Sequence, residues 1–309
     1  MIWLVSRVNF SVGLHPFRVL LKPGDGVPFV DSRRDFNVAV IVPTFNRRDI
    51  TVQFVRKINA QEVPVRIYVC DSGSTDGTVS AVASEPNIRV VSAGSAAWWS
   101  AAVNRGIEAA RNDGVGIFLV MNDDIKFDQN LMSVLLACHR EHPRCVVSPL
   151  QWTDSGAFVG TLYEGPLRRV RHLANAPGDG LVATSNGCCL LIPQEIFNTV
   201  GRFDEQNCPH LYGDTEFQLR ALKAGFPTRI CDAVAIRQLP ATNYSARLRL
   251  STLFTFEGSP LHWRAYKSFG KALFGNYFRF AILGLRFHFD FVKVLVMTLK
   301  YLAQKTSRQ

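Results

Sequence analysis

The sequence predicts an α/β fold: a mostly parallel central sheet with helices on both faces. Continuous apolar runs of strand length alternate with helix-length segments over residues 38–121, which is the pattern of repeated strand–helix–strand units. The first run, VAVIVP (38–43), is continuously apolar, as expected of a strand that is covered on both faces. In addition, polar segments follow three of the runs, and the ligands of such sheets bind beyond the carboxyl ends of the strands.

The predicted elements of the first half are short and regular. The strands are expected at residues 38–43, 65–70, 88–93 and 116–121. The helices between them are expected at residues 47–61, near 76–84 and at 99–113. The second half is less regular, and its expected elements are strands within 145–165, a strand that enters a short helix over 181–197, a helix at 213–226 and a strand at 228–234.

Three parts are expected along the chain. Residues 1–37 are an N-terminal lead-in that ends in a turn-rich linker. Their apolar start is interrupted by charged residues and Pro16, unlike a signal peptide or a membrane span. Residues 38–236 hold the α/β elements, and residues 237–309 form a basic, helical C-terminal extension.

The formal net charge of +10 belongs to this extension. From Arg237 onward there are twelve Lys or Arg residues and two acids, so the extension accounts for the whole excess and the first 236 residues are neutral in sum. A neutral first part argues against an extended nucleic-acid surface, and no nucleic-acid partner is expected.

A stripe of basic residues is expected over 279–300. Four of them are seven residues apart and would share one face of a helix, among many apolar residues: Arg279, Arg286, Lys293 and Lys300. A membrane-spanning helix would bury these charges, whereas a helix in the membrane surface would direct them to anionic headgroups. We therefore favour a membrane-surface partner, and a helix docked on the rest of the protein is the alternative.

The seven cysteines form no CxxC pair, and their number is odd. Several lie in apolar runs, as buried thiols do. This pattern indicates a reducing compartment rather than a disulfide framework or a zinc site. The expected location is therefore cytoplasmic, peripheral on the inner face of the cell membrane.

Three polar segments follow predicted strands and are expected to form one pocket: PTFNRRD (43–49), DSGSTDGT (71–78) and NDD (122–124). Each alone could be a turn or a helix cap. The acceptor-only carboxylate of Asp71 suits a base or ribose, and Arg47 suits a phosphate. Asp123 and Asp124 suit Mg²⁺ or Mn²⁺ that bridges to a diphosphate. No GxGxxG motif supports a dinucleotide site.

Further motifs extend this set in a characteristic order from about residue 38 to 232. They read VIVPTFNR, YVCDSGSTDGT, AAVNRGIEAA, LVMNDDI, NGCCLLIP and GRFDEQ…HLYGDTEFQLRALKAGF. Together they resemble a family 2 glycosyltransferase of the GT-A fold. The likeness is closest to the rhamnosyltransferase-like or galactofuranosyltransferase-like branch, and residues 38–236 would then be the GT-A catalytic domain.

The resemblance implies which residues bind the donor. In that family the loop after the first strand and the Asp after the second strand hold the nucleotide, and the matching residues here are Pro43, Thr44, Asn46 and Asp71. Asn104 matches the Asn of the family's Asn-x-Gly-Ile helix and would lie near the donor.

The same resemblance places NDD at the family's metal-binding DXD motif. Asp124 matches its last, metal-binding acid, and Asp123 would contact the ribose or the metal. Asn122 replaces the first acid. The segment CDAVAIRQLP has no His at the place where many relatives carry an additional ligand.

The family's catalytic base is an acid that opens a helix in the second half, usually within a Glu-Asp pair. Asp214 matches the Asp, and Gly213 replaces the Glu. A helix N-cap is the alternative role for Asp214. Glu216 is expected to pair with Arg220 across one helical turn instead of acting as the base.

Trp98 is a further candidate for the donor pocket, because aromatic faces stack on sugars and bases. Its alternative role is core packing.

The implied function is that of an inverting, metal-dependent glycosyltransferase. The donor would be a UDP- or dTDP-linked sugar, and the acceptor a hydroxyl of a glycan or a lipid-linked glycan in cell-envelope polysaccharide synthesis. Two other classes remain open. One is a metal-dependent nucleotidyltransferase, although no Gly-rich, Lys-bearing loop follows the first strand. The other is a non-catalytic protein that binds the membrane surface.

Overall fold

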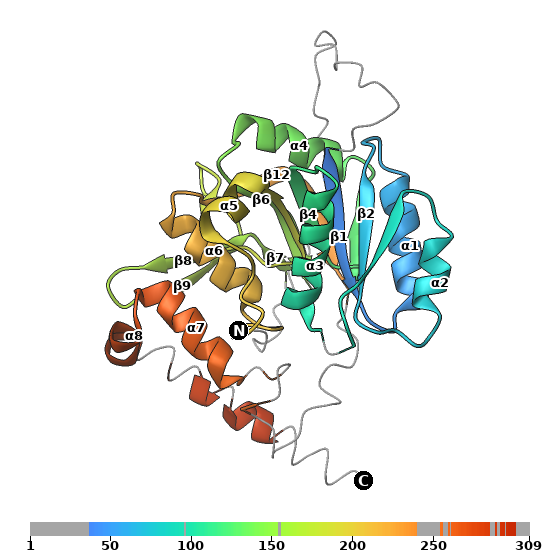
Figure 1. Cartoon of the computed structure of the whole chain (residues 1–309). Coiled ribbons are helices and arrows are strands. Elements are labelled where there is room, and N and C mark those ends of the chain that lie inside the picture. Colours follow the sequence, from blue (N-terminus) through green and yellow to red (C-terminus); the bar gives the residue numbers. More distant parts are fainter. Residues whose placement is uncertain are drawn as a thin grey trace.

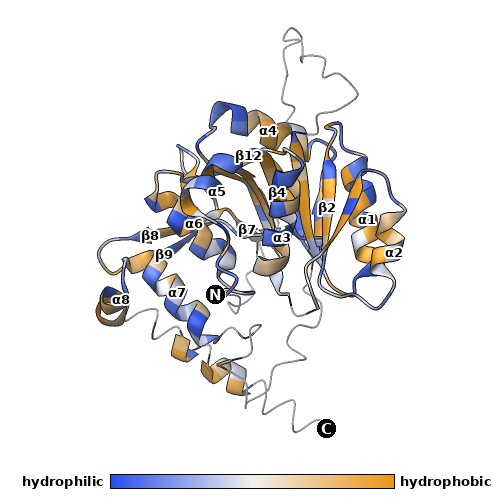
Figure 2. Ribbon diagram, viewed as in Figure 1, coloured by the Kyte–Doolittle hydropathy of each residue, from blue (hydrophilic) through white to orange (hydrophobic). Residues whose placement is uncertain are grey.

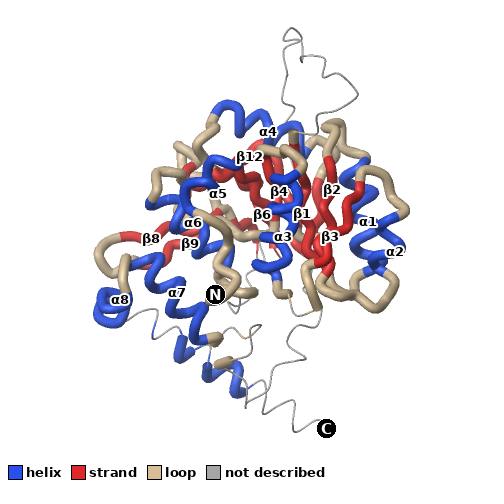
Figure 3. The backbone as a smooth tube through the Cα atoms, in the orientation of Figure 1, coloured by secondary structure: helices blue, strands red, loops and turns tan. Residues whose placement is uncertain are grey.

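The computed structural model describes residues 37–95, 97–153, 156–239, 254–255, 259, 261–284, 288, 291–293 and 295–300. Its centre is a 10-stranded sheet whose main path runs β10-β12-β6-β11-β4-β1-β2-β3, with β5 paired to β12 and β7 paired to β6. Helices lie on both faces of this sheet (Figures 1 and 3). The predicted N-terminal lead-in lies outside the described residues, apart from Asn37.

The first half is the parallel part of the sheet. Its strands are β1 (Val38–Thr44), β2 (Arg66–Asp71), β3 (Ile88–Ser92) and β4 (Ile117–Met121). Its helices are α1 (Arg48–Asn59), α2 (Thr78–Ala83) and α3 (Trp99–Asn112). β1 pairs in parallel with both β2 and β4, and β2 pairs in parallel with β3. The alternation of strands and helices that the sequence predicts for this half is confirmed.

The second half makes the sheet mixed. Its strands are β5 (Ile125–Phe127), β6 (Val146–Thr153), β7 (Gly156–Phe158), β8 (Gly160–Glu164), β9 (Arg169–Leu173), β10 (Leu181–Val182), β11 (Cys189–Pro193) and β12 (Thr228–Gln238). Its helices are α4 (Leu131–Glu141), α5 (Gln194–Val200) and α6 (Gly213–Lys223). β11 runs antiparallel to β4 and β6, whereas β12 runs parallel to β6. Helix α4 has no counterpart among the predicted elements, and β12 continues beyond the predicted end of its strand.

The apolar core forms two layers because successive side chains of a strand point to opposite faces. On one face, Val40 and Val42 of β1 pack in a cluster with residues of α1 and α4. On the other face, Ala39 and Ile41 pack in a cluster with residues of α3, α5 and α6. Figure 2 shows the central strands mostly in the colours of hydrophobic residues, whereas the helices around them carry both hydrophobic and hydrophilic residues. Burial on both faces explains why the strands read as unbroken apolar runs.

The C-terminal extension starts with the last residues of β12, and most of its described residues from Trp263 onward are helical. Helix α7 (Trp263–Phe274) lies against α6 and below the β8–β9 hairpin, and α8 (Tyr277–Leu283) follows it (Figure 1). Leu219 of α6 shares an apolar cluster with Phe269 of α7 and Phe280 of α8. In the described part of the chain, no helix combines the length and the apolar character needed to cross a membrane.

The predicted stripe over 279–300 is interrupted in the structure. Helix α8 ends at Leu283, next to Gly284, and helical residues are described again at 288, 291–293 and 295–300. Arg286 lies outside the described residues. The seven-residue spacing therefore does not by itself define one continuous helical face.

Helix α3 approaches the sheet closely at Gly106. A Cβ atom at this position would collide with Cys70 Sγ of β2 and with Ile41 of β1. We expect Gly106→Ala to lower the free energy of unfolding by about 1–3 kcal/mol, because the helix must move away from a close-packed core. Urea unfolding of the purified protein measures this change.

Gly178→Ala is the matched control, since a Cβ atom there meets nothing within 4 Å. A loss at Gly106 smaller than about 0.5 kcal/mol would contradict the close packing of α3 on β1 and β2.

Candidate active site

The carboxyl ends of β1 and β4 form the switch point of the sheet. From β1 the chain builds β2 and β3 on one side, and it then returns to place β4 on the other side of β1. The loops that leave two such strands diverge and leave a crevice between them. Residues 45–47 follow β1 and residues 122–124 follow β4, so two of the predicted polar segments meet here.

Arg47 and the two acids after β4 form a charged cluster where these two loops meet. Arg47 Nη2 lies 3.2 Å from Asp123 Oδ1 and 3.1 Å from Asp124 Oδ2. Thr51 of α1 donates a hydrogen bond of 2.7 Å to Asp123 Oδ2. Asp123 is only 4% exposed. Burial raises the pKa of its carboxyl group, while Arg47 and Thr51 act in the opposite direction.

The residues fit a divalent cation that takes its remaining ligands from phosphate and water. Asp124 Oδ1 is buried and has no hydrogen-bond partner, which is unusual for a buried carboxylate oxygen. The described residues contain no group of three His, Cys, Asp or Glu side chains that could enclose a metal. Mg²⁺ needs no such enclosure, because it binds one or two carboxylates together with substrate phosphates.

The side chain of Asn122, which the resemblance places at the first position of the DXD motif, makes contacts within the protein. Its Oδ1 accepts a hydrogen bond of 2.9 Å from Trp99 Nε1. Its backbone N–H donates to Cys188 O at 3.0 Å. The amide thus fixes the NDD segment between α3 and the start of β11.

Hydrogen bonds join the loop after β1 to the loop after β2. Asn46 adopts φ 51°. Its backbone N–H donates to Ser74 Oγ at 2.8 Å, and its Oδ1 accepts from Thr75 N at 2.7 Å. Asp71 Oδ2 accepts from the backbone N–H groups of Gly73 and Ser74, both at 3.0 Å. These two predicted nucleotide-binding residues therefore shape the loops in which they stand.

Pro43 and Thr44 end β1 beside β2, where they pair in register with Cys70 and Asp71. Thr44 is buried, and its Oγ1 lies 2.8 Å from Thr51 Oγ1. Through Thr51 it supports the carboxylate of Asp123.

The pairing of β11 with β4 brings Asp214 close to the NDD loop at the carboxyl end of β4. Gly187, just before β11, donates its backbone N–H to Asp214 Oδ2 at 2.6 Å. The thiol of the next residue, Cys188, has its pKa raised by burial and then by the charges of Asp124 and Asp214. Asp124, the predicted metal ligand, and Asp214, the predicted base, therefore both lie near residues 187–188.

Asp214 is not the N-cap of α6. The capping residue is Tyr212, in the left-handed region at φ 64°, and Asp214 is the second residue of the helix. Asp214 Oδ1 accepts from Thr215 N at 2.8 Å. Burial raises the pKa of the Asp214 carboxyl group, partly offset by the N–H groups of Thr215 and Gly187. The N-cap alternative is wrong, and a carboxylate with a raised pKa is suited to accept a proton.

Two glycines allow Asp214 its position. A Cβ atom on Gly187 would lie 2.7 Å from Asp214 Cβ and 2.8 Å from its Oδ2. A Cβ atom on Gly213 would collide with Ser100 Oγ of α3 and would lie 3.1 Å from Cys208 O. At Gly213, where the resemblance implies a Glu, α6 and α3 therefore meet with little room for a side chain.

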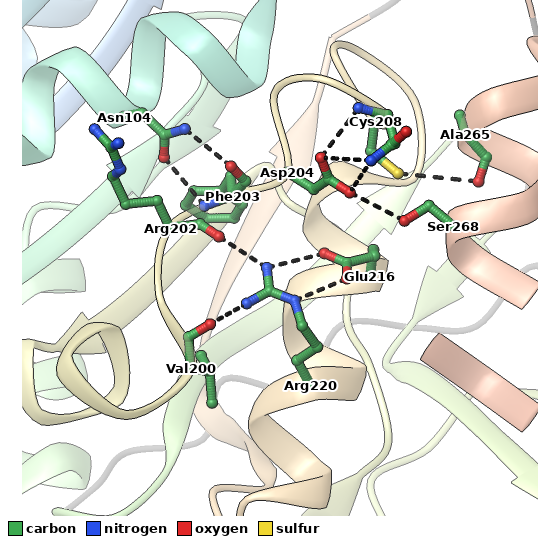
Figure 4. Close-up of polar contacts among 11 residues, drawn as sticks. Asn104, Val200, Arg202, Phe203, Asp204, Cys208, Glu216, Arg220, Ala265 and Ser268 are labelled. Atoms are coloured by element: carbon green, nitrogen blue, oxygen red, sulfur yellow. Dashed lines mark hydrogen bonds and ion pairs between the residues drawn. The ribbon is translucent and has the colours of Figure 1, made fainter. Parts of the chain in front are cut away.

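The loop over residues 201–212 leads into α6 and is held from several sides (Figure 4). Arg220 binds both carboxylate oxygens of Glu216, at 2.7 and 2.9 Å, and donates to the carbonyls of Val200 and Arg202. The predicted Glu216–Arg220 pair is confirmed. Ser268 of α7 donates to Asp204 Oδ2 at 3.1 Å, so the C-terminal extension also holds this loop.

Asn104 holds the same loop from α3. Its Nδ2 donates to Phe203 O at 2.9 Å, and its Oδ1 accepts from Phe203 N at 3.1 Å (Figure 4). The side chain is almost fully buried. Both ends of the amide are thus engaged within the protein, and its predicted role near the donor stays a prediction.

His210 is a residue to which the sequence analysis assigned no role. Its ring centroid lies 5.2 Å from that of Trp98, the residue that caps α3. Burial lowers the pKa of His210 to about 4, so its ring is neutral at neutral pH. Its place four residues before Asp214, in HLYGD, is the signal that could have drawn attention to it.

The chain is similar to a curated rhamnosyltransferase. It is 25% identical over 265 residues to the N-acetylglucosaminyl-diphospho-decaprenol L-rhamnosyltransferase of Mycobacterium tuberculosis, and the match covers 73% of this chain and 86% of the relative.

Two solved structures share the fold. One is the mannosyltransferase PcManGT from Pyrobaculum calidifontis in complex with GDP-Man and Mn²⁺, with a TM-score of 0.51 and 20% identity over 70% of this chain and 60% of that one. The other is TarS of S. aureus, residues 1–349, in complex with UDP-GlcNAc, with a TM-score of 0.53 and 14% identity over 76% of this chain and 66% of that one. The GT-A fold predicted from the motifs is confirmed.

A family model decides the classification. Residues 39–201 match the model described as glycosyl transferase family 2, a span of more than half of the 309 residues. It contains the loops after β1, β2 and β4 and ends just before the loop that leads to Asp214. The chain therefore belongs to glycosyl transferase family 2.

Proposed function

We propose that this glycosyltransferase moves a sugar from a UDP- or dTDP-linked donor to a hydroxyl of a lipid-linked glycan, with inversion at the anomeric carbon. One observation carries the proposal. The segment 186–188 bonds to the NDD loop through Cys188 O and to Asp214 through Gly187 N–H. The two acids of the NDD loop and a carboxylate with a raised pKa thus lie on two sides of this segment, which supports a metal–diphosphate side and a base side of one site.

The donor half of the site lies at the ends of β1, β2 and β4. Asp71 and the loop of Pro43, Thr44 and Asn46 bind the nucleoside, and Arg47 binds the diphosphate. The hydrogen bonds between these loops support this role, because they hold the loops rigid before the donor arrives. Trp98 and Asn104, on the neighbouring α3, complete the donor side.

Asp124, together with Asp123, would hold Mg²⁺ or Mn²⁺. The unpartnered oxygen of Asp124 supports this assignment, and the Pyrobaculum mannosyltransferase was solved with Mn²⁺. When bound, such an ion neutralises the charge that develops on the departing diphosphate.

Asp214 acts as the general base. It accepts the proton of the acceptor hydroxyl while that oxygen forms a bond to the anomeric carbon. The bond between this carbon and the diphosphate oxygen breaks, and the electron pair leaves with the nucleoside diphosphate. A single displacement of this kind inverts the anomeric configuration. The N–H groups of Gly187 and Thr215 hold the carboxylate in one orientation.

The acceptor is lipid-linked, in cell-envelope polysaccharide synthesis. The name of the M. tuberculosis relative describes a decaprenol-linked acceptor, which supports this substrate class. We further propose that residues 38–236 form the catalytic domain and that the extension over 237–309 brings it to the membrane. The enzyme would then be cytoplasmic and peripheral on the inner face of the membrane.

The surface of the extension supports this attachment. Phe278 of α8 is 73% exposed and Ile282 is 52% exposed. Lys267 Nζ lies 5.1 Å from the ring of Trp263 and 5.3 Å from that of Tyr277, both of which are exposed. Exposed apolar side chains beside cations and aromatic rings are typical of helices that lie in the headgroup region.

The first test is calorimetric titration of the protein with UDP and dTDP, in Mn²⁺ and in EDTA. We expect one diphosphate to bind in Mn²⁺ and to lose its affinity in EDTA. Asp124→Ala should weaken this binding about 100-fold, because it removes a charged ligand of the metal–diphosphate complex. Asp128→Ala removes an equal charge from an exposed residue nearby and should leave the affinity unchanged. Equal binding in EDTA would contradict the metal site.

The second test concerns the base. Asp214→Asn should lower the transfer rate constant by at least about 100-fold while donor binding is retained, because only proton removal is lost. Asp232→Asn, on the exposed side of β12, is the control.

Asp214 must be ionised to accept a proton, and its pKa is raised. In the unaltered enzyme, activity should therefore fall as the pH decreases through this raised pKa, above the ordinary range of Asp near pH 3.9. A rate that stays constant down to pH 4 would exclude Asp214 as the base.

The third test concerns the membrane surface. Phe278→Ser combined with Ile282→Ser should weaken binding to phosphatidylglycerol vesicles about tenfold or more, since two apolar anchors are lost. Co-sedimentation with vesicles measures this, and Trp152→Ser, which removes an exposed apolar side chain on β6, is the control. Unchanged binding of the double variant would show that the extension does not contact the lipid through α8.

A further inference from the structure

Arg47 supplies the positive charge between the two acids of the NDD loop. Its Nη2 is within 3.2 Å of a carboxylate oxygen of each. Without this guanidinium, Asp123 and Asp124 would face each other as adjacent like charges in a mostly buried place. Arg47 therefore stands where a cation is electrostatically required.

The guanidinium is held there by charge and not by well-directed hydrogen bonds. Arg47 Nε and Nη2 are buried, yet neither makes a hydrogen bond of acceptable geometry. An Arg side chain normally binds a carboxylate through two parallel N–H···O bonds, as Arg220 binds Glu216. Since a buried donor without an acceptor costs free energy, Arg47 would gain by moving to an acceptor that it can bind fully.

The backbone around Arg47 can stay fixed during such a movement. Its N–H donates to Thr78 Oγ1 at 3.3 Å, and its carbonyl accepts the first hydrogen bonds of α1. An open hollow of about 330 Å³ borders the residue at the first turn of α1. The side chain alone can therefore leave the acids.

We propose that Arg47 is an exchangeable counter-cation: it neutralises Asp123 and Asp124 in the donor-free enzyme, and it moves onto the diphosphate oxygens when a divalent cation arrives with the donor. This proposal rests on the proposed function of the site. It adds that Arg47 opposes binding of the metal alone and favours binding of the metal together with a diphosphate. The enzyme thereby takes up the metal with its donor and not before it.

If Arg47 exchanges in this way, its replacement should change the affinities for Mn²⁺ and for the diphosphate in opposite directions. In Arg47→Met, Mn²⁺ alone should bind about fivefold more tightly, because it no longer displaces an ion pair. In saturating Mn²⁺, the preferred nucleoside diphosphate should bind about tenfold more weakly, because a charge-assisted contact to phosphate is lost. Arg47→Lys keeps the charge and should bind Mn²⁺ alone as the unaltered enzyme does.

Isothermal calorimetry measures both affinities, first with MnCl₂ and then with UDP or dTDP in saturating Mn²⁺. Arg48→Met is the matched control, because Arg48 is exposed and its Nε pairs with Asp49 at 2.9 Å, away from the two acids. Thermal unfolding establishes that each variant is folded, and Arg47→Lys provides the test should Arg47→Met fail to fold. In that case, Mn²⁺ affinity of the Lys variant must stay unchanged while diphosphate affinity falls, because Lys lacks the planar fork of Arg.

Opposite changes in the two affinities support the exchange. Weaker binding of both ligands, or an unchanged affinity for Mn²⁺ alone in Arg47→Met, overturns it. These outcomes are distinct from failure of the proposed function. If the unaltered enzyme binds no diphosphate under any condition, the donor site itself is wrong. If it binds a diphosphate in Mn²⁺ but the variant shows no gain in Mn²⁺ affinity, only the exchange is wrong.

Discussion

The antiparallel pairing of β11 with β4 is the constraint on which the site depends. Cys189 pairs with Met121, so the residues just before β11 lie beside the NDD loop that follows β4. Through Gly187 this pairing also fixes Asp214 at the start of α6. A parallel sheet alone would gather only the loops after β1, β2 and β4. The reversal of one strand brings Asp214, from the second half of the chain, close to the loops that follow β1 and β4.

The site retains charged groups in places where burial disfavours their charged forms. The pKa values of Asp123 and Asp214 are raised, mainly by desolvation. With raised pKa values, these two carboxyl groups bind protons more readily in the folded protein than in the unfolded chain. The free energy of unfolding therefore decreases as the pH rises from their ordinary pKa values to their raised ones. At neutral pH both acids therefore lower stability. The polar contacts from Thr51, Gly187 and Thr215 limit this loss and keep the carboxylates oriented.

The parallel half of the fold could be predicted from the sequence because β1, β2 and β4 are buried on both faces and the loops between the elements are rich in Asp, Gly and Ser. The candidate residues at those strand ends followed from the same pattern. The mixed half could not be predicted to this extent. Helix α4 is apolar at almost every position up to Cys138, so its sequence shows little helical periodicity. The extra length of β12 depends on pairing with β5 and β6. Contacts such as Arg47 with the acid pair join residues far apart in sequence through particular rotamers, which no local pattern encodes.

The close contact of Gly213 with Ser100 has a consequence for how this enzyme can change through mutation. The family resemblance places a Glu at this position, and a side chain introduced here would collide with the Ser100 hydroxyl and lie tightly against the carbonyl of Cys208. Ser100 itself donates a hydrogen bond to that carbonyl at 2.6 Å, so it cannot be removed without leaving a buried acceptor without its donor. Substitution of Gly213 alone or of Ser100 alone is therefore unfavourable. A Glu at position 213 requires changes in both α3 and the 201–212 loop. Positions 213 and 100 thus behave as a coupled pair, in which the residue that one position tolerates depends on the residue at the other.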